Sequence, residues 1–557
     1  IVMKKLLPFL CAAALALSLT ACAGTMNNSM ADAASDVTFT FTDSGVTAAG
    51  ETNTGYEIDD TALTITDSGT YTVSGSCADG SIKVKKGTTG VTLVLNGLDL
   101  TSEKTAAITC AKSTEVTILA FDGTENALSD TEQNNDETYP DNADTENAVI
   151  KCKDGSTVTL GGTGALTVTA NGKNGIKSGT TTDEDGEASL TIQNLTLTID
   201  APVNDAINAE QLLNVESGTL TIDAADEAIH CDLVLNIGAD GTDGPTIDIT
   251  NCCEGLEAAE LNIYSGDIDI TATDDCLNAA NSDLSGYDFT MTIAGGTINA
   301  YTSGGDGFDS NGDLTITGGT VIVWTDNTAD NEPLDADGTI AVSGGTVLAA
   351  GGSAGMGMSL EATQPCVIFS LSGGMGGFRG GPNDTQNSAD NAQAAVSNIA
   401  KGATLDIRNA DGSSLYSAEV PCTVNYVFFS SPDLTANESD TLCSGEETVA
   451  TATAQTGTVS QGMGGMGTFP GGQRPNGEQQ DGQPGEPPEG FDGQTPDGER
   501  PELPNGEVPE MPGGERPDFS DGERPEPPDG SQRPEAGSAP ADSGASGTYN
   551  VDTTPAA

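Results

Sequence analysis

The amino-acid sequence predicts an all-β fold, a solenoid of the parallel β-helix type. Three observations support this prediction. A short acidic string returns along the middle of the chain, for example as "PVNDAINAE" from Pro202, "ATDDCLNAA" from Ala272 and "SGGDGFDSN" from Ser303. Each unit also holds a short alternating pattern such as "GTLTIDA" or "GGTVIVW", and strong helical periodicity is missing. Short strands with glycine-rich turns, repeated about every 20–50 residues, are typical of a solenoid, whereas a propeller blade needs about 40 residues.

The N-terminal segment is predicted to be a lipoprotein signal peptide. Lys4 and Lys5 precede the apolar run "LLPFLCAAALALSL", which is too short to span a bilayer comfortably. The string "LTAC" that ends at Cys22 resembles the bacterial lipobox, in which the cysteine is lipidated. We therefore expect a secreted protein, lipid-anchored to the outer face of the bacterial cell membrane and touching the membrane only through that anchor. An ordinary secretory signal with a chance cysteine is the alternative.

Composition and patterning divide the chain into six parts. Proline, glycine and acids with almost no apolar residues fill the last part, and such a segment cannot bury enough surface to order itself. The predicted parts are a signal peptide with lipobox (1–22), a linker (23–36), an N-terminal β region or cap (37–100), the parallel β-helix (101–357), a C-terminal β cap (358–444) and a disordered acidic Pro/Gly-rich tail (445–557).

The apolar residue of each acidic string gives a register mark for the coils. After a polar insertion between the first two marks, the spacings range from 21 to 31 residues. In a parallel β-helix, equivalent residues of successive coils stack about 4.8 Å apart. Each mark should therefore lie above the next one, pointing inward. The marks are Ile108, Ile150, Ile176, Ile207, Ile229, Leu256, Leu277, Phe308 and Leu334.

The net charge of the chain restricts its partners. The sequence has 84 Asp and Glu against 19 Lys and Arg, which gives a net charge of −65. Such a surface repels nucleic acid and anionic membranes, so neither is expected as a partner. It attracts cations, of which calcium is the first to consider outside cells.

Two polar columns flank the marks, one two residues before and one a single residue after. Two carboxylates about 4.8 Å apart repel by roughly 1 kcal/mol in water and roughly 3.5 kcal/mol at an effective dielectric of 20. Either their pKa values rise or cations bind between the coils, and calcium accepts carboxylates in loose geometry. A solvated acidic edge with Asp and Asn as turn residues is the alternative. The predicted metal ligands are Asp205, Asp226, Glu227, Glu254, Asp274, Asp275, Asp306, Asp309, Glu332 and Asp335.

The second residue after each mark is small, and three of these positions hold Cys110, Cys152 and Cys231. A column that admits only small side chains favours buried free thiols over disulfides. The neighbouring Cys252, Cys253 and Cys276 could still bridge or bind metal, although their spacing matches no zinc pattern.

No catalytic residue is predicted, for two reasons. Lysine and arginine are missing from Ser178 to Phe378, so the acid-rich coils hold no strongly basic side chain for β-elimination of a uronate. Glycoside hydrolysis needs two carboxylates at a set separation, but these acids are periodic rather than singular. His230, the single histidine, lies in the second polar column, where a surface or ligand-edge role is favoured over that of a general base.

Tyr301 and Trp324 occupy equivalent places in "GGTINAY" and "GGTVIVW". Strand alternation points both rings outward on adjacent coils, so we expect a carbohydrate-binding platform there. Packing beneath a loop or the C-terminal cap is the alternative.

The strings "DSGTYTVSG", "VTLVLNGLDLT", "TENALSD", "GGTINA", "TQPCVIFSL" and "FFSSPDL", with the acidic corners, resemble clostridial carbohydrate-binding β-helix proteins related in fold to family 9 pectate lyases. The resemblance implies a right-handed parallel β-helix, calcium held by corner acids, and binding to cellulose-like or pectin-like polymers. Glu254 and Glu332 stand where Asp is usual in that family. Its lyases use a lysine base beside calcium, for which the acidic coils here have no equivalent.

The leading hypothesis is a surface-anchored, non-catalytic protein that binds extracellular polysaccharide in a calcium-dependent way, with plant cell-wall glycans as ligands. The second is a calcium-dependent polysaccharide lyase of the pectate-lyase type that uses Lys151, Lys173 or Lys177. The third is a structural surface adhesin or spacer for which sugar is irrelevant.

Overall fold

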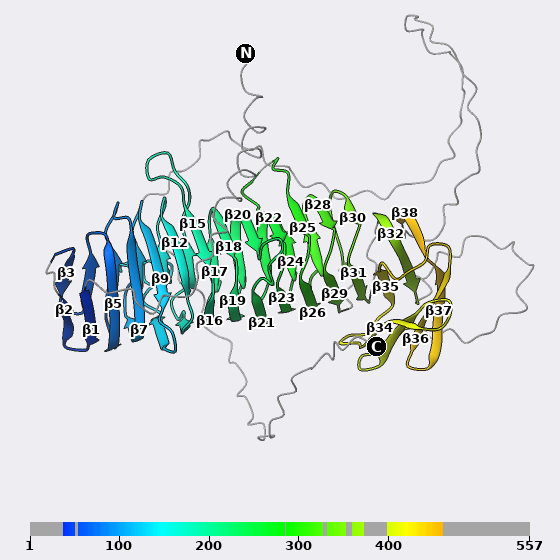
Figure 1. The fold of residues 1–557 in the computed structure, drawn as a ribbon, viewed down its shortest axis with the longest axis horizontal. Coiled ribbons are helices and arrows are strands. Elements are labelled where there is room, and N and C mark those ends of the chain that lie inside the picture. Colours follow the sequence, from blue (N-terminus) through cyan, green and yellow to red (C-terminus); the bar gives the residue numbers. More distant parts are fainter. Residues whose placement is uncertain are drawn as a thin grey trace, which may run out of the picture. The chain divides into compact units, whose positions relative to one another are not determined.

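A computed structural model of the chain describes residues 37–50, 54–284, 286–326, 331–352, 359–371 and 398–460. The described residues form strands and turns without a helix, and none of their segments is a helix able to cross a membrane. The predicted signal peptide, Cys22, the linker and nearly all of the predicted tail lie outside these residues. Most strands pair in parallel with the equivalent strand of the next coil, which confirms an all-β, solenoid-like fold (Figure 1).

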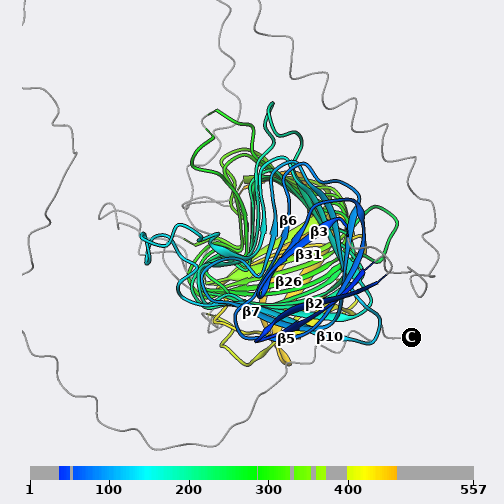
Figure 2. The same cartoon turned by 90° about the vertical axis from the view of Figure 1, so that its left-hand side faces the viewer.

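Three parallel faces enclose the interior, and successive coils follow nearly the same path around it (Figure 2). The first face holds β4 (Ala62–Ile65), β6 (Ser81–Val84), β8 (Ile108–Cys110), β11 (Ala148–Cys152), β14 (Asn174–Ser178), β17 (Ile207–Ala209), the first halves of β20 (Ile229–Ile237) and β22 (Leu256–Ile263), β24 (Leu277–Ala279) and β27 (Phe308–Ser310).

The second face continues from the long strands of the first. It holds β9 (Glu115–Ala120), β12 (Thr157–Gly162), β15 (Ser189–Ile192), β18 (Leu212–Val215), the second halves of β20 and β22, β25 (Thr290–Ile293), β28 (Asp313–Ile316), β30 (Ile340–Val342) and β32 (Ser359–Ser370).

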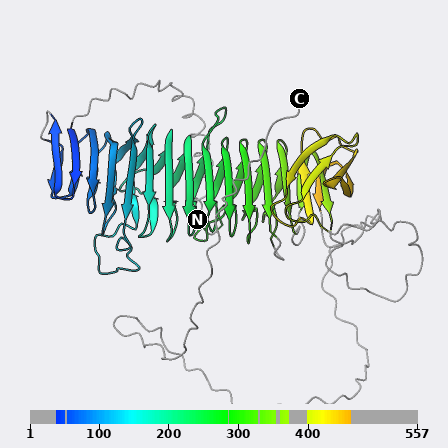
Figure 3. The ribbon, with the colours of Figure 1, turned by 90° about the horizontal axis from the view of Figure 1, so that it is seen from below.

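The third face forms a long row of strands (Figure 3). It holds the second halves of β5 (Gly69–Cys77) and β7 (Val91–Ser102), β10 (Glu125–Asp130), β13 (Ala165–Thr169), β16 (Leu195–Ala201), β19 (Gly218–Ala224), β21 (Thr246–Asn251), β23 (Asp267–Ala272), β26 (Thr297–Thr302), β29 (Thr320–Thr325) and β31 (Thr346–Gly351). The first halves of β5 and β7 belong to the second face, where β7 pairs with β9.

The parallel stack begins earlier than the sequence predicted. β4 pairs in parallel with β6, and β1 (Val37–Thr42) pairs in parallel with β5, so coils are already present before residue 101. The predicted boundary is wrong because these coils lack the acidic string that served as the register signal. Only β2 (Gly45–Gly50), antiparallel to β1, and β3 (Tyr56–Asp59), antiparallel to β4, depart from the parallel pattern here.

Antiparallel strands follow the last coils. β35 (Tyr426–Ser430) pairs with β31 and β32, and β38 (Gln455–Ser460) pairs with β32. A separate sheet has the order β34 (Ser414–Glu419), β33 (Thr404–Arg408), β36 (Ser439–Ser444) and β37 (Glu447–Thr453). The predicted start of the tail at residue 445 is therefore too early, since the alternating "ETVATATAQTGTV" supplies two further strands.

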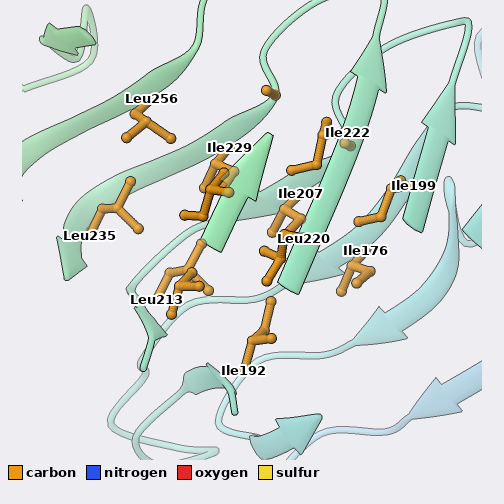
Figure 4. Packing of buried hydrophobic residues seen from close by; sticks show 14 of the residues in the cluster. Ile176, Ile192, Ile199, Ile207, Leu213, Leu220, Ile222, Ile229, Leu235 and Leu256 are labelled. Atoms are coloured by element: carbon orange, nitrogen blue, oxygen red, sulfur yellow. The ribbon is translucent and has the colours of Figure 1, made fainter. Parts of the chain in front are cut away.

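Stacked aliphatic side chains fill the interior, and the register marks lie among them. Backbone pairing aligns all nine marks from Ile108 to Leu334, as the sequence predicted. Ile207, Ile229 and Leu256 are fully buried beside inward residues of the other two faces, such as Leu213 and Ile222 (Figure 4). Because each coil packs only against its neighbours, stability depends on every mark being apolar.

The substitution Ile229→Ala should lower the free energy of unfolding by about 2–5 kcal/mol, because it leaves a cavity in a site with no solvent access. The urea denaturation midpoint measures the effect. Thr198→Ala, on the exposed side of β16, is the matched control and should change stability by less than about 0.5 kcal/mol. Equal effects of the two substitutions would contradict the assigned register.

Candidate cation-binding site

The acidic strings meet along one edge of the solenoid, where the chain enters the first face. The carbonyl oxygen of each residue two before a mark accepts a hydrogen bond from the preceding coil. Gly175 N donates to Asp205 O over 3.0 Å, Ala206 N to Glu227 O over 3.1 Å, and Ala228 N to Glu254 O over 2.9 Å. The ladder continues through the carbonyl oxygens of Asp275, Asp306 and Glu332. The predicted polar column therefore exists, and we call it the acidic edge.

In two of these coils the residue between the acid and its mark is a glycine, because the backbones approach closely there. A Cβ added at Gly255 would lie 2.3 Å from the carbonyl oxygen of Cys276 on the next coil, and one at Gly307 would lie 2.4 Å from Pro333 O. A side chain would not fit at these two glycines, so the polar groups beside them are held close to those of the adjacent coil.

The column one residue after each mark joins the acidic edge through side-chain hydrogen bonds. Lys177 Nζ donates to Asn208 Oδ1 over 2.9 Å, and Asn208 Nδ2 donates to Asp205 Oδ2 over 2.6 Å. Farther along, Asn278 Nδ2 donates to Glu254 Oε2 over 2.9 Å. The two polar columns are thus a single network of groups from successive coils.

Asp205, Asp226 and Glu227 form the most strongly constrained group of this network. Each offers a carboxylate oxygen within 4.8 Å of the others. Asp205 is only 2% exposed, and its Oδ1 has no hydrogen-bond partner among the described residues. A buried acceptor without a donor is costly. Because every member is an acceptor when ionised, a cation is the ligand that this group can take.

Asp306, Asp309 and Asp335 form a second group of carboxylates within the same distance of one another. All three are partly buried, and the backbone holds one of them, since Asp306 Oδ1 accepts a hydrogen bond from Glu332 N. Nearby, the Oδ1 of buried Asn278 also lacks a hydrogen-bond partner within the described part of the chain. These oxygens too could serve as cation ligands.

His230 lies beside the first carboxylate group and acts as an internal counter-ion. Its Nδ1 lies 2.5 Å from Glu257 Oε2, and its Nε2 lies 2.8 Å from Asp232 Oδ1. Burial lowers the pKa of His230, but the hydrogen bonds to Asp232 and Glu257 raise it more, so the net shift is upward. Glu227, His230 and Glu257 lie close enough for a metal, yet both ring nitrogens already contact carboxylates. This histidine therefore neutralises part of the acidic edge.

The structure divides the predicted ligands into two classes. Six of them form the two carboxylate groups: Asp205, Asp226 and Glu227, then Asp306, Asp309 and Asp335. Four lie in neither group: Glu254, Asp274, Asp275 and Glu332.

Local contacts explain part of this division. Glu254 accepts from Asn278, and Asp275 Oδ1 accepts from Asp306 N over 2.6 Å, so these side chains bind protein donors. Asp274 is exposed. Sequence reasoning placed Glu257 in a polar column but did not identify it as the partner of His230. Their positions one residue after consecutive marks were the available signal.

Proton affinities along the edge are shifted upward. Burial raises the pKa of Asp275 to about 8, that of Glu254 to about 7, and those of Asp306 and Asp309 to about 6. Burial and the nearby Asp205 raise the pKa of Glu227 as well. Without a cation the edge therefore holds protons near neutral pH, as expected when like charges are stacked with little solvent.

The predicted aromatic platform is wrong for Trp324. Tyr301 and Trp324 are paired neighbours on β26 and β29, as expected. However, Trp324 is only 7% exposed and packs with Val367, Phe369 and other apolar residues of the C-terminal strands. Tyr301 packs partly against the same cluster. The rings point outward from the coils, but a long-range contact covers them, which was the alternative considered from the sequence.

The thiols match the sequence prediction. All ten described cysteines are free, and every one except the half-buried Cys253 is buried. Cys110 pairs with Cys152 on adjacent coils, and Cys231 lies in the same small column. Neither a disulfide nor a cysteine-containing metal group is found among these residues.

Comparisons with known proteins place these features in context. Residues 59–260 match the family model described as "Carbohydrate-binding domain-containing protein". A curated protein of the same description from Acetivibrio thermocellus is 38% identical over 130 residues, which cover 23% of this chain and 43% of the relative. The chain thus spans less than half of that relative. The solved structure of a polysaccharide lyase-like protein from C. thermocellum, a gadolinium derivative, is 23% identical and covers 55% of this chain and 96% of its own, with a TM-score of 0.30, too low to relate the two folds.

Proposed function

We propose that this protein binds extracellular polysaccharide and that calcium held at the acidic edge supports this binding. The observation that favours a cation most strongly is the buried, unpartnered Asp205 Oδ1 beside the carboxylates of Asp226 and Glu227. Calcium is the best candidate because it accepts several oxygen ligands at 2.3–2.6 Å in flexible geometry. In this proposal the group Asp306, Asp309 and Asp335 is a second calcium site.

The carbohydrate part of the proposal rests on the similarity of residues 59–260 to a carbohydrate-binding domain family. The matched segment includes Asp205, Asp226 and Glu227 but ends before the second carboxylate group. A cation bound at the first group would place positive charge on an otherwise acidic surface. It could then bridge the protein and the carboxylates of an acidic glycan. We further propose that the protein acts at the cell surface through a lipid on Cys22, without catalysis.

One observation favours a second candidate, a calcium-dependent lyase. Lys151 on β11 is half-buried, and its pKa is lowered. The larger cause is burial, and the second is the positive charge of the neighbouring Lys177. A base that removes a proton beside a sugar carboxylate needs such a lowered pKa. Lys173 and Lys177, the other candidates from the sequence, form ion pairs with Glu137 and Glu210, so Lys151 is the stronger candidate.

Calcium should stabilise the protein, and the substitution Asp205→Asn should weaken calcium binding at least about tenfold. At about 100 times its Kd, calcium should add about 2.7 kcal/mol to the wild-type free energy of unfolding. Without calcium the variant should be as stable as the wild type or more so, because a buried carboxylate is removed. Titration calorimetry and thermal melts measure both effects. The matched control is Asp200→Asn, which changes an exposed carboxylate on β16 and should leave calcium affinity unchanged. Equal calcium affinity of the Asp205→Asn variant and the wild type would contradict the site.

The metal-free protein should lose stability as the pH rises. The raised pKa values mean that the folded state keeps protons that the unfolded state has already lost at the ordinary carboxyl pKa. This contribution to stability is therefore fully present below about pH 4, falls as the pH rises above that value, and is lost once the pH passes the folded-state pKa values of about 6–8. Melting temperatures in chelator at about pH 5 and about pH 8.5 test this, and calcium should reduce the difference. A melting temperature that rises with pH in chelator would refute the assigned electrostatics.

Retention on insoluble glycans separates the functional candidates. If the protein is a binding protein, it should be retained on a pectin-like or cellulose-like polymer in the presence of calcium. Chelator should reduce this retention, and the polymer should be recovered intact. In the same mixtures, ultraviolet-absorbing unsaturated products that disappear with Lys151→Ala would instead establish the lyase. Absence of retention on any polymer, with or without calcium, would favour a structural adhesin or spacer.

A further inference from the structure

Lys151 has surroundings unlike those of the lysines near it. It is half-buried on β11, and within the described residues its ammonium group forms no hydrogen bond or ion pair. Leaving a partly desolvated charge without a partner is unfavourable. The pKa of Lys151 is lowered, first by burial and then by the charge of Lys177, because both make the charged form of the side chain less favourable.

A second ammonium group lies on the next coil. Lys151 and Lys177 are backbone partners of β11 and β14, so their Cα atoms stack at about the inter-strand spacing of 4.8 Å. The Lys177 ammonium is fixed by Asn208 Oδ1 at 2.9 Å and by Glu210 Oε1 at 3.6 Å. Two like charges are thus held side by side in a chain whose net charge is −65.

The two carboxylates that attract Lys151 electrostatically each contact another lysine. Glu146 lies 2.6 Å from Lys153 Nζ, and Glu210 lies 3.6 Å from Lys177 Nζ. The positive charge of Lys151 therefore remains uncompensated by a direct partner and is available to an external anion.

The lysine pair is connected to the first carboxylate group. Lys177 donates to Asn208, and Asn208 donates to Asp205 Oδ2, so a hydrogen-bond chain runs from Lys177 to Asp205, whose carboxylate lies beside those of Asp226 and Glu227. The two sites lie on consecutive coils of the same edge. A polymer that follows the edge would meet ammonium groups first and a cation-binding group next.

We propose that Lys151 and Lys177 form an anion-binding site that takes the carboxylate of an acidic polysaccharide, such as a uronate polymer. The inference rests on the proposed polysaccharide-binding function and names the class of polymer. Carboxylate donors satisfy the unpartnered ammonium, and a neutral glucan cannot. One carboxylate of the polymer binds the lysine pair while another contacts calcium at Asp205, Asp226 and Glu227.

The test compares the affinity of wild type, Lys151→Met and Lys173→Met for polygalacturonate in calcium buffer. Lys151→Met should weaken binding about tenfold or more, as expected for loss of a charge-assisted contact, with unchanged affinity for calcium and for a neutral glucan. Lys173→Met removes the same charge from an existing ion pair and should change the affinity by less than about threefold. Lys151→Met should also melt at the wild-type temperature or above it, because an unpartnered charge has been removed.

Four outcomes would overturn the site. These are wild-type affinity of Lys151→Met for polygalacturonate, a joint loss of affinity and melting temperature in that variant, wild-type binding to the neutral glucan alone, or preference of the wild type for dextran sulfate over polygalacturonate. The third would leave the proposed function intact. One further result separates the two proposals. If chelator leaves the wild-type affinity for polygalacturonate unchanged but the Lys151→Met substitution lowers it, the lysine site is supported and the calcium requirement is contradicted.

Discussion

The fixed spacing between parallel coils is the constraint on which the rest of this structure depends. Backbone hydrogen bonds hold equivalent residues of adjacent coils about 4.8 Å apart, whatever their side chains are. Apolar residues gain from this repetition, since Ile207, Ile229 and Leu256 stack in register and are fully buried in one cluster. Charged residues do not gain from it, because the same spacing forces carboxylates together.

Some carboxylates of the acidic edge are relieved of this repulsion by groups of the protein itself, and others are not. Asn208 and Asn278 donate hydrogen bonds to Asp205 and Glu254, and His230 contributes a positive charge between Glu257 and Asp232. These internal donors do not reach every oxygen. Where they stop, carboxylates gather in groups of three, and the remaining acceptors suit an external cation.

The column after the register marks also changes sign along the chain. After Thr109 it holds Lys151 and Lys177, then Asn208 and His230, and it ends with acids such as Asp309. A ligand that lies along this column therefore meets ammonium groups at one end and metal-binding groups farther on. That order suits a polymer with repeated negative charges better than a small neutral sugar.

The sequence was sufficient to predict the fold class, the register of the coils and the position of the acidic edge, because these depend on local periodicity. It was not sufficient to predict how side chains share the edge. The pairing of His230 with Glu257 and the isolation of Lys151 depend on rotamers and on acids from other coils. The burial of Trp324 depends on C-terminal strands that are remote in sequence and follow no repeat. The early coils were missed because they lack acidic strings.

Anomalous diffraction from a crystal grown in millimolar calcium would test the central claim most directly. Our account places a calcium ion between the carboxylates of Asp205, Asp226 and Glu227, within about 2.6 Å of Asp205 Oδ1. An ordered edge with no anomalous peak there, and with Asp205 Oδ1 bound instead to a protein donor, would contradict it.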